Sequence, residues 1–197
     1  ETHKLNWDNK LTLEFTGVNP SVQSIRIRPA EKPFTENLKI FISEARKRGM
    51  YPVLLTPVQR RNFDANGKIV NTHGKYPDAV RKLAGDENVP FIDLHQMTKI
   101  MYEAWGEKTS VCAFVHYPAG TFPGQNTELK DNSHFNAYGG YEVARCVIEG
   151  IRQNGLTDIL QRLRPEIRPF DPAKPDDVKK FNIPPSPFVE IAKPDGN

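Results

Sequence analysis

The sequence predicts an α/β fold on three observations. From residue 34 onward, helical patterns alternate with short apolar runs bounded by turn residues, as in strands buried on both faces of a parallel sheet. Before residue 34, apolar and polar residues alternate with period 2, which is typical of antiparallel strands. From residue 165 onward, eight of the 17 prolines occur, which disfavours helices. We therefore expect three parts, at 1–33, 34–164 and 165–197.

The composition fits a single globular domain with appendages. The chain has 197 residues, of which 38% are hydrophobic and 26% charged. It contains no apolar run of about 18 residues, so we expect no membrane span. A net charge of +3 is too small to predict a nucleic-acid partner. Cys112 and Cys146 have no metal-type spacing, and we expect two free thiols.

The first part contains two strand patterns, at residues 11–15 and 24–28, separated by turn residues. Two strands alone are marginal, so this part is interpreted as the end of a β-sandwich whose earlier strands are absent. Residues 29–33 begin and end with proline and are expected to form the linker out of it.

The second part is expected to alternate helix and strand. The first helix starts at Phe34, with Thr35 as its N-cap and Gly49 at its C-terminal end. The following elements are a strand at 51–56, a helix that opens at Pro77, a strand at 89–94, a helix around 97–104, a short strand at 111–115 and a helix at 137–153. Such a pattern predicts a parallel sheet with helices on both sides. The third part is expected to be an extended tail on the surface.

Asp131 and His134 are the strongest candidates for catalysis. They are expected to lie in the loop that enters the helix at 137–153. A carboxylate three residues before a histidine can accept a hydrogen bond from the imidazole and leave its other nitrogen free as a general base. The alternative is that Asp131 or Asn132 caps the helix and His134 is a surface residue.

Four further residues are candidates for substrate binding. Arg60 and Arg61 follow a predicted buried strand, where ligands of open α/β sheets bind, and arginine pairs well with carboxylates. His73 and His116 lie in loops that could line the same cleft, although structural hydrogen bonding explains them equally well. We expect no metal site, because the histidines lack short metal-binding spacings. Capping accounts for the remaining candidates, Asp93 and His95.

Several motifs occur in a characteristic order. The run D-N-S-H-F-N-A-Y-G follows T-P-V-Q-R-R, T-H-G-K-Y-P and P-F-I-D-L-H. Together they resemble the C-terminal half of SGNH (GDSL-type) hydrolases, and in particular of rhamnogalacturonan acetylesterases. The resemblance implies a flavodoxin-like SGNH fold with a three-layer parallel sheet, and it assigns Asp131 and His134 to a Ser-His-Asp triad. The implied protein is a secreted serine esterase, extracellular or periplasmic, that needs no cofactor and removes acetyl groups from the pectic polysaccharide rhamnogalacturonan.

The nucleophile expected from this resemblance is absent from the sequence. Neither G-D-S nor G-x-S-x-G occurs, and the oxyanion-hole motif G-x-N-D is also missing. Ser133 is unsuited, because adjacent residues before a helix tend to point apart. We therefore expect the parallel sheet to be incomplete and the chain to be interrupted between Pro33 and Phe34, after an accessory carbohydrate-associated β-sandwich. The alternatives are a noncatalytic carbohydrate-binding or scaffold protein and an SGNH esterase or lipase with a lipid or aryl ester substrate.

Overall fold

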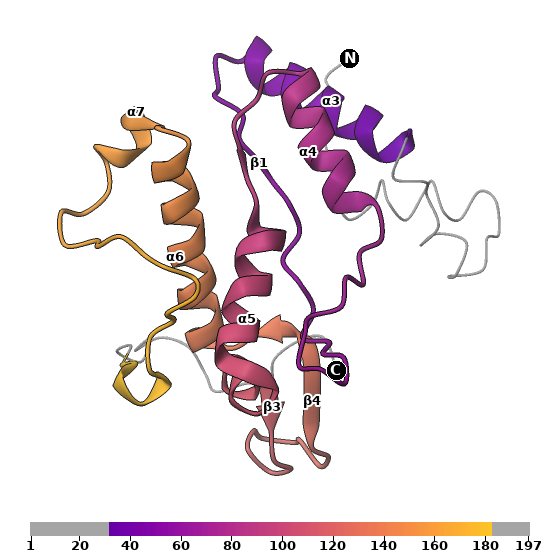
Figure 1. Cartoon of the computed structure of the whole chain (residues 1–197), viewed down its shortest axis with the longest axis vertical. Coiled ribbons are helices and arrows are strands. Elements are labelled where there is room, and N and C mark those ends of the chain that lie inside the picture. The colour runs from indigo at the N-terminus through magenta and orange to yellow at the C-terminus, as the bar shows by residue number, and fades with distance from the viewer. Residues whose placement is uncertain (1–31, 183–197) are drawn as a thin grey trace. The chain divides into compact units, whose positions relative to one another are not determined.

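The computed structural model describes residues 32–182 of the chain (Figure 1). The chain divides into two compact units, Glu1–Tyr51 and Pro52–Asn197. The strands predicted at 11–15 and 24–28, and the β-sandwich they imply, lie outside the described residues, as does the part of the tail after residue 182. None of the helices within residues 32–182 has the length and apolar character needed to span a membrane.

Helix α3 (Pro33–Lys47) is the described element of the first unit. It starts one residue earlier than expected, and its N-cap is Lys32 instead of Thr35. Proline suits the first helical position, because its φ is already helical and its missing N–H has no partner to lose there. Pro33 and Phe34 are thus consecutive residues of one helix in this sequence, and the expected missing segment between them stays a prediction. Gly49, with φ at 67°, ends the helix as expected.

The second unit begins with a small parallel sheet. Strand β1 (Leu54–Leu55) pairs with β2 (Phe91–Ile92), and helix α4 (Tyr76–Asp86) lies between them in the sequence. Both strands were expected and both are shorter than predicted. Hydrogen bonds from Leu54 N to Pro90 O (2.9 Å) and from Thr56 N to Ile92 O (3.1 Å) hold the pair together. The alternation of strand and helix and this parallel pairing are compatible with the predicted α/β class.

The second sheet is antiparallel and was not predicted. After helix α5 (Leu94–Ser110), the 3-10 turn η1 (Val111–Ala113) replaces most of the strand expected at 111–115. Strand β3 (Phe114–Tyr117) then pairs with β4 (Leu129–Phe135). Residues 131–134 therefore belong to a strand instead of a loop. Period-2 patterning could not reveal β4, because its burial alternates only over its first three residues and residues 132–134 are all polar and exposed.

Helix α6 (Ala137–Gln153) has the bounds that the sequence pattern predicted. Its N-cap is Asn136, whose side chain accepts a hydrogen bond from Gly139 N at 3.1 Å. Neither Asp131 nor Asn132 caps it. Its buried face includes Cys146, which is a free thiol, as is Cys112. The cluster of buried residues in this core is Ile69, Ile92, Leu94, Met97, Met101, Tyr102, Ala113, Phe114, Tyr138, Cys146 and Phe170.

The proline-rich tail runs back along α6 after the short helix α7 (Thr157–Leu160), as Figure 1 shows. Its contacts move toward the N-terminus of α6 as the tail proceeds. Arg152 donates to Ile167 O, Phe170 N donates to Glu149, and Asp176 N donates to the fully buried Glu142. Phe170 is buried, and the last described element is the 3-10 turn η2 (Val178–Lys180). The described tail is therefore extended and surface-laid, as expected, and anchored on α6.

The first turn of α6 packs so closely on η1 that it requires a glycine. A Cβ added to Gly139 would lie 2.0 Å from the carbonyl oxygen of Ala113, whereas one added to Gly140 would meet no atom within 4 Å. We predict that Gly139→Ala lowers the free energy of unfolding by about 1–3 kcal/mol, because the backbone of η1 must move. Gly140→Ala, the matched control, should raise it by up to about 1 kcal/mol through helix propensity. Denaturant unfolding of both variants measures this, and equal effects would contradict the close approach.

Candidate functional site

The carboxylate of Asp131 organises the end of β4. Asp131 is buried, and one carboxylate oxygen accepts the backbone N–H groups of Ser133 (2.6 Å) and His134 (3.1 Å). This is an Asx-type turn, in which a short side chain hydrogen-bonds the backbone that follows it. The second oxygen contacts Nδ1 of His134. The expected pairing of Asp131 with His134 is therefore present in the structure, and the catalytic role of the two residues stays a prediction.

The electrostatics of the pair suit a carboxylate, Asp131, that orients an imidazole, His134, as a base. Burial by itself would raise the pKa of Asp131, but hydrogen bonds from the His134 side chain and from two backbone N–H groups outweigh it and lower the pKa. An ionised carboxylate can only accept a hydrogen bond, so Nδ1 of His134 is the donor. In neutral His134 the proton therefore lies on Nδ1, and Nε2 carries the lone pair. The His134 side chain is 58% exposed, and within residues 32–182 nothing hydrogen-bonds its Nε2. That nitrogen can accept a proton from a bound group.

Arg61 joins the same cluster, but as an internal clamp. Its guanidinium donates to Ser110 Oγ (2.9 Å), to Asn132 Oδ1 (3.0 Å) and to the carbonyl oxygen of Glu107. Burial lowers its pKa from the ordinary arginine value. Because its guanidinium group already donates hydrogen bonds to three protein atoms, Arg61 is less suited to bind a substrate carboxylate than the sequence suggested. Arg60 is exposed, and its guanidinium forms no hydrogen bond or ion pair with the described part of the chain, although its backbone carbonyl accepts from Asn62 N at 2.8 Å.

His116 and Asn132 complete the cluster. His116 lies on β3, and its Nε2 contacts Asn132 Oδ1 at 2.9 Å. Asn132 is thus shared by Arg61 and His116, and it stands between Asp131 and His134 in the sequence. Sequence reasoning considered Asn132 only as a helix cap and missed this function. Its position inside the D-x-x-H spacing is the only signal that could have indicated it.

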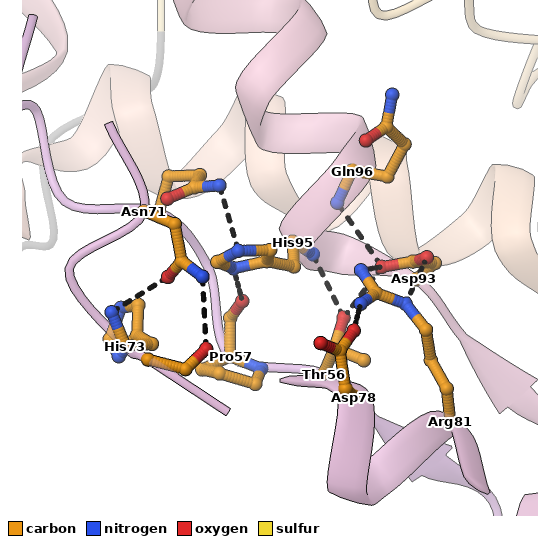
Figure 2. A network of polar contacts seen from close by, with 11 residues as sticks. Thr56, Pro57, Asn71, His73, Asp78, Arg81, Asp93, His95 and Gln96 are labelled. Atoms are coloured by element: carbon orange, nitrogen blue, oxygen red, sulfur yellow. Dashed lines mark hydrogen bonds and ion pairs between the residues drawn. The ribbon is translucent and has the colours of Figure 1, made fainter. Parts of the chain in front are cut away.

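His73 lies in a different polar network, which Figure 2 shows. Its ring stands edge-on to His95, with 5.8 Å between the centroids, and its backbone N–H donates to Asn71. No contact between the described residues joins His73 to Asp131 or His134. Burial, followed by the charge of Arg60, lowers the pKa of His73. The structure therefore separates His73 from the Asp131–His134 pair, although the charge of Arg60 acts on it.

His95 is the centre of that network. Its Nδ1 contacts Pro57 O at 3.2 Å, and its Nε2 contacts the amide nitrogen of Gln59 at 2.9 Å. A carbonyl can only accept and an amide nitrogen can only donate, so the proton of His95 lies on Nδ1. The backbone N–H of His95 also donates to Thr56 Oγ1 at 2.8 Å. His95 therefore ties the start of α5 to three residues of the segment after β1.

Asp93 caps α5, as the sequence predicted, and also holds Arg81. Its carboxylate accepts from Gln96 N (3.1 Å), from Thr56 Oγ1 (3.0 Å) and from two nitrogens of Arg81 (2.9 and 3.0 Å) (Figure 2). Burial would raise the pKa of Asp93, but these hydrogen bonds, led by Arg81, lower it. Gln59 is fixed in turn, because its N–H donates to Thr98 Oγ1 and its carbonyl accepts from Tyr102. The chain that leads to Arg60 and Arg61 is thus anchored on α5.

The described residues contain no group of three histidine, cysteine, aspartate or glutamate side chains that could hold a metal ion. A cavity of about 510 Å³ lies between α6 and the tail, away from the proposed catalytic pair. Its lining residues are Tyr141, Pro175, Asp176, Asp177, Lys180, Phe181 and Asn182. None of the six site residues predicted from the sequence lines it.

Together, the fold and the site describe an α/β protein with a hydrogen-bonded Asp–His pair that leaves one imidazole nitrogen exposed. Over 123 residues the chain is 45% identical to the rhamnogalacturonan acetylesterase RhgT of Bacillus subtilis (strain 168), a match that covers 62% of this chain and 53% of that protein. Over 128 residues it is 31% identical to the probable rhamnogalacturonan acetylesterase YesY of the same organism, covering 64% of this chain and 54% of that protein.

The predicted resemblance to rhamnogalacturonan acetylesterases is therefore confirmed for part of the chain. The chain spans about half the length of the curated relatives it matches. No protein-family model matches the sequence. No solved structure matches it either.

The buried His95 and the partly buried His73 predict how stability depends on pH. Burial is the main cause that lowers the pKa of His95 below 6.5, and the same holds for His73. In the unfolded chain both histidines regain their ordinary pKa, so below about pH 6.5 the unfolded state binds more protons than the folded state. Their contribution to stability is present above the ordinary pKa and is lost as the pH falls through the folded pKa.

We therefore predict that the free energy of unfolding falls between about pH 7.5 and pH 5.5, and that it falls less in His95→Gln, which cannot titrate. Urea unfolding at the two pH values measures both losses. An equal loss in the wild type and in His95→Gln would show that His95 does not contribute to the pH dependence.

Proposed function

We propose that this chain carries the acid–base half of a serine esterase that removes acetyl groups from rhamnogalacturonan. The observation that carries the proposal is the hydrogen bond between the buried Asp131 carboxylate and His134, whose other nitrogen is exposed. The partial similarity to two proteins named as rhamnogalacturonan acetylesterases supports the substrate class. A flavodoxin-like SGNH fold and an extracellular or periplasmic location belong to the same proposal.

The reaction needs a serine that His134 can deprotonate. In the first step the serine oxygen attacks the acetyl carbonyl while Nε2 of His134 takes its proton, and Asp131 stabilises the imidazolium that forms. The sugar hydroxyl then leaves with that proton, and the acetyl group stays on the serine. In the second step His134 deprotonates a water, which attacks the acetyl-enzyme, and acetate leaves as the proton returns to the serine oxygen. No cofactor takes part in either step.

The proposed nucleophile is a serine outside this sequence. Ser110 is buried, and its hydroxyl accepts from Arg61 and donates to Glu107 O. Ser133 donates its backbone N–H to Asp131, and no hydrogen bond joins a serine hydroxyl to His134 within residues 32–182. A serine brought to Nε2 of His134 would complete the triad.

A second candidate function is carbohydrate binding without catalysis. The absent nucleophile motif favours it, and so does the cavity beside α6, because the aromatic rings of Tyr141 and Phe181 line it, with their centroids 5.4 Å apart. Aromatic faces with neighbouring carboxylate, amide and ammonium groups suit sugar rings and hydroxyls. An esterase for lipid or aryl esters is a third candidate, which no specific observation favours.

The first test removes the proposed base. In the protein that carries this chain, we predict that His134→Ala lowers acetyl release from acetylated rhamnogalacturonan by at least about 10³-fold, the scale found when a triad member is removed. Lys82→Ala, an exposed lysine on α4 paired with Asp86, is the control and should keep full activity. Both variants should unfold like the wild type. Acetyl release that is absent from the wild type, with retained polymer binding, would favour the binding function instead.

The second test concerns recognition of uronate groups. Arg60 is exposed and adjacent to the anchored Arg61, so it is free to pair with a galacturonate carboxylate. We predict that Arg60→Ala raises KM for the acidic polymer by roughly fivefold, the scale of one exposed ion pair, and leaves kcat/KM for a small aryl acetate unchanged. Steady-state kinetics on the two substrates measures this. An equal effect on both substrates would exclude a contact with the uronate.

A further inference from the structure

Three hydrogen bonds converge on Asn132 from two separate elements. Its side-chain oxygen accepts from Arg61 at 3.0 Å and contacts Nε2 of His116 at 2.9 Å, while its backbone carbonyl accepts Arg61 N–H at 2.8 Å. Arg61 belongs to the segment after β1, and His116 belongs to β3. Asn132 therefore joins β4 to both of them at one point.

The turn around Asp131 needs such an attachment. Within residues 32–182, the hydrogen bonds that its carboxylate accepts come from Ser133 and His134, within three residues. They fix the internal geometry of the turn but not its orientation, and the pairing of β4 with β3 involves Leu129, Lys130 and Phe135, on either side of the turn. Asn132, Ser133 and His134 are all exposed, so packing supports this orientation weakly. The contacts of Asn132 provide the missing support.

Arg61, which makes two of these three hydrogen bonds, is itself held by other residues. Two further donors of Arg61 bind Ser110 Oγ and Glu107 O, at the C-terminal end of α5. The flat guanidinium fork sets direction as well as distance in such contacts. A neutral amide at position 132 also accepts two donors without placing a second negative charge beside Asp131. An amide therefore suits this position better than a carboxylate.

We propose that Asn132 is a positioning residue, which acts through the turn 131–134 to hold the imidazole of His134 in the orientation needed for proton transfer. This inference rests on the proposed esterase function for its catalytic consequence. The claim that Asn132 orients His134 does not depend on that function, because the orientation and hydrogen bonding of His134 can be measured without any substrate.

The decisive experiment follows the Nδ1 proton of His134 by NMR in protein labelled with ¹⁵N-histidine. In the wild type, ¹⁵N shifts should report protonation at Nδ1 and a lone pair at Nε2. In Asn132→Ala we expect the Nδ1 proton to exchange with water roughly tenfold faster, the factor that corresponds to losing one or two net hydrogen bonds. Lys130→Ala is the matched control, because Lys130 is an exposed residue of β4 whose ammonium pairs only with Glu128 among the described residues.

A second pair of variants guards against misfolding of Asn132→Ala. His116→Ala removes one donor to Asn132, and His116→Gln restores a donor at nearly the same place. We expect His116→Ala to speed exchange of the His134 proton and His116→Gln to return it toward the wild-type rate. A merely structural role for Asn132 would lower the melting temperature without changing this exchange rate, and that result would overturn the proposal.

Kinetics then separates the two proposals. If the protein releases acetyl groups, Asn132→Ala should lower kcat by roughly 10- to 100-fold with little change in KM, since misorientation affects the reaction more than binding. A wild type without acetyl release contradicts the esterase function and leaves the NMR result to decide the role of Asn132. Acetyl release with the same kcat in Asn132→Ala and the wild type contradicts the positioning role alone.

Discussion

The hydrogen bonds between α5 and the segment that follows β1 are the constraint on which the site depends. A parallel pair of two-residue strands cannot by itself fix the chain that leaves it. Asp93, His95 and Thr98 of the α5 N-terminal region bind Thr56, Pro57 and Gln59 through contacts that are buried at Gln59 and partly buried at Asp93 and Pro57. At Gln59 the polar groups lie away from water, so a broken contact there leaves an unpaired buried group and is costly. The segment is consequently held in one conformation up to Arg61.

Arg61 carries this constraint to the second sheet. Its contact with Asn132 links the parallel sheet to β4, and Asn132 neighbours the turn in which Asp131 holds His134. The network on α5 thus positions Arg61, and the guanidinium group of Arg61 in turn positions the turn that carries the exposed His134. Such an order would suit a base that must meet a substrate, because the imidazole is exposed while the protein beneath it fixes its orientation.

The sequence predicted the elements with strong apolar periodicity and missed those held by polar contacts. Helix α6 was predicted with its observed bounds, because its buried face repeats at helical spacing, and the Asp131–His134 pair followed from the motif. Strand β4 was read as a loop, since residues 132–134 are polar and exposed, and its partner β3 supplies the order that its own sequence lacks. The position of His73 beside His95, and the use of Arg61 as a clamp, depend on contacts between distant segments that no local pattern contains.

The central claim is that His134 activates a serine, and covalent labelling tests it most directly. A fluorophosphonate probe modifies only serines whose hydroxyl is deprotonated by a neighbouring base, and peptide mapping identifies the labelled residue. The account predicts labelling of one serine that is none of residues 21, 24, 43, 110, 133 and 186, and loss of that labelling in His134→Ala. A protein that is not labelled, or whose labelling is the same in His134→Ala, would contradict the claim.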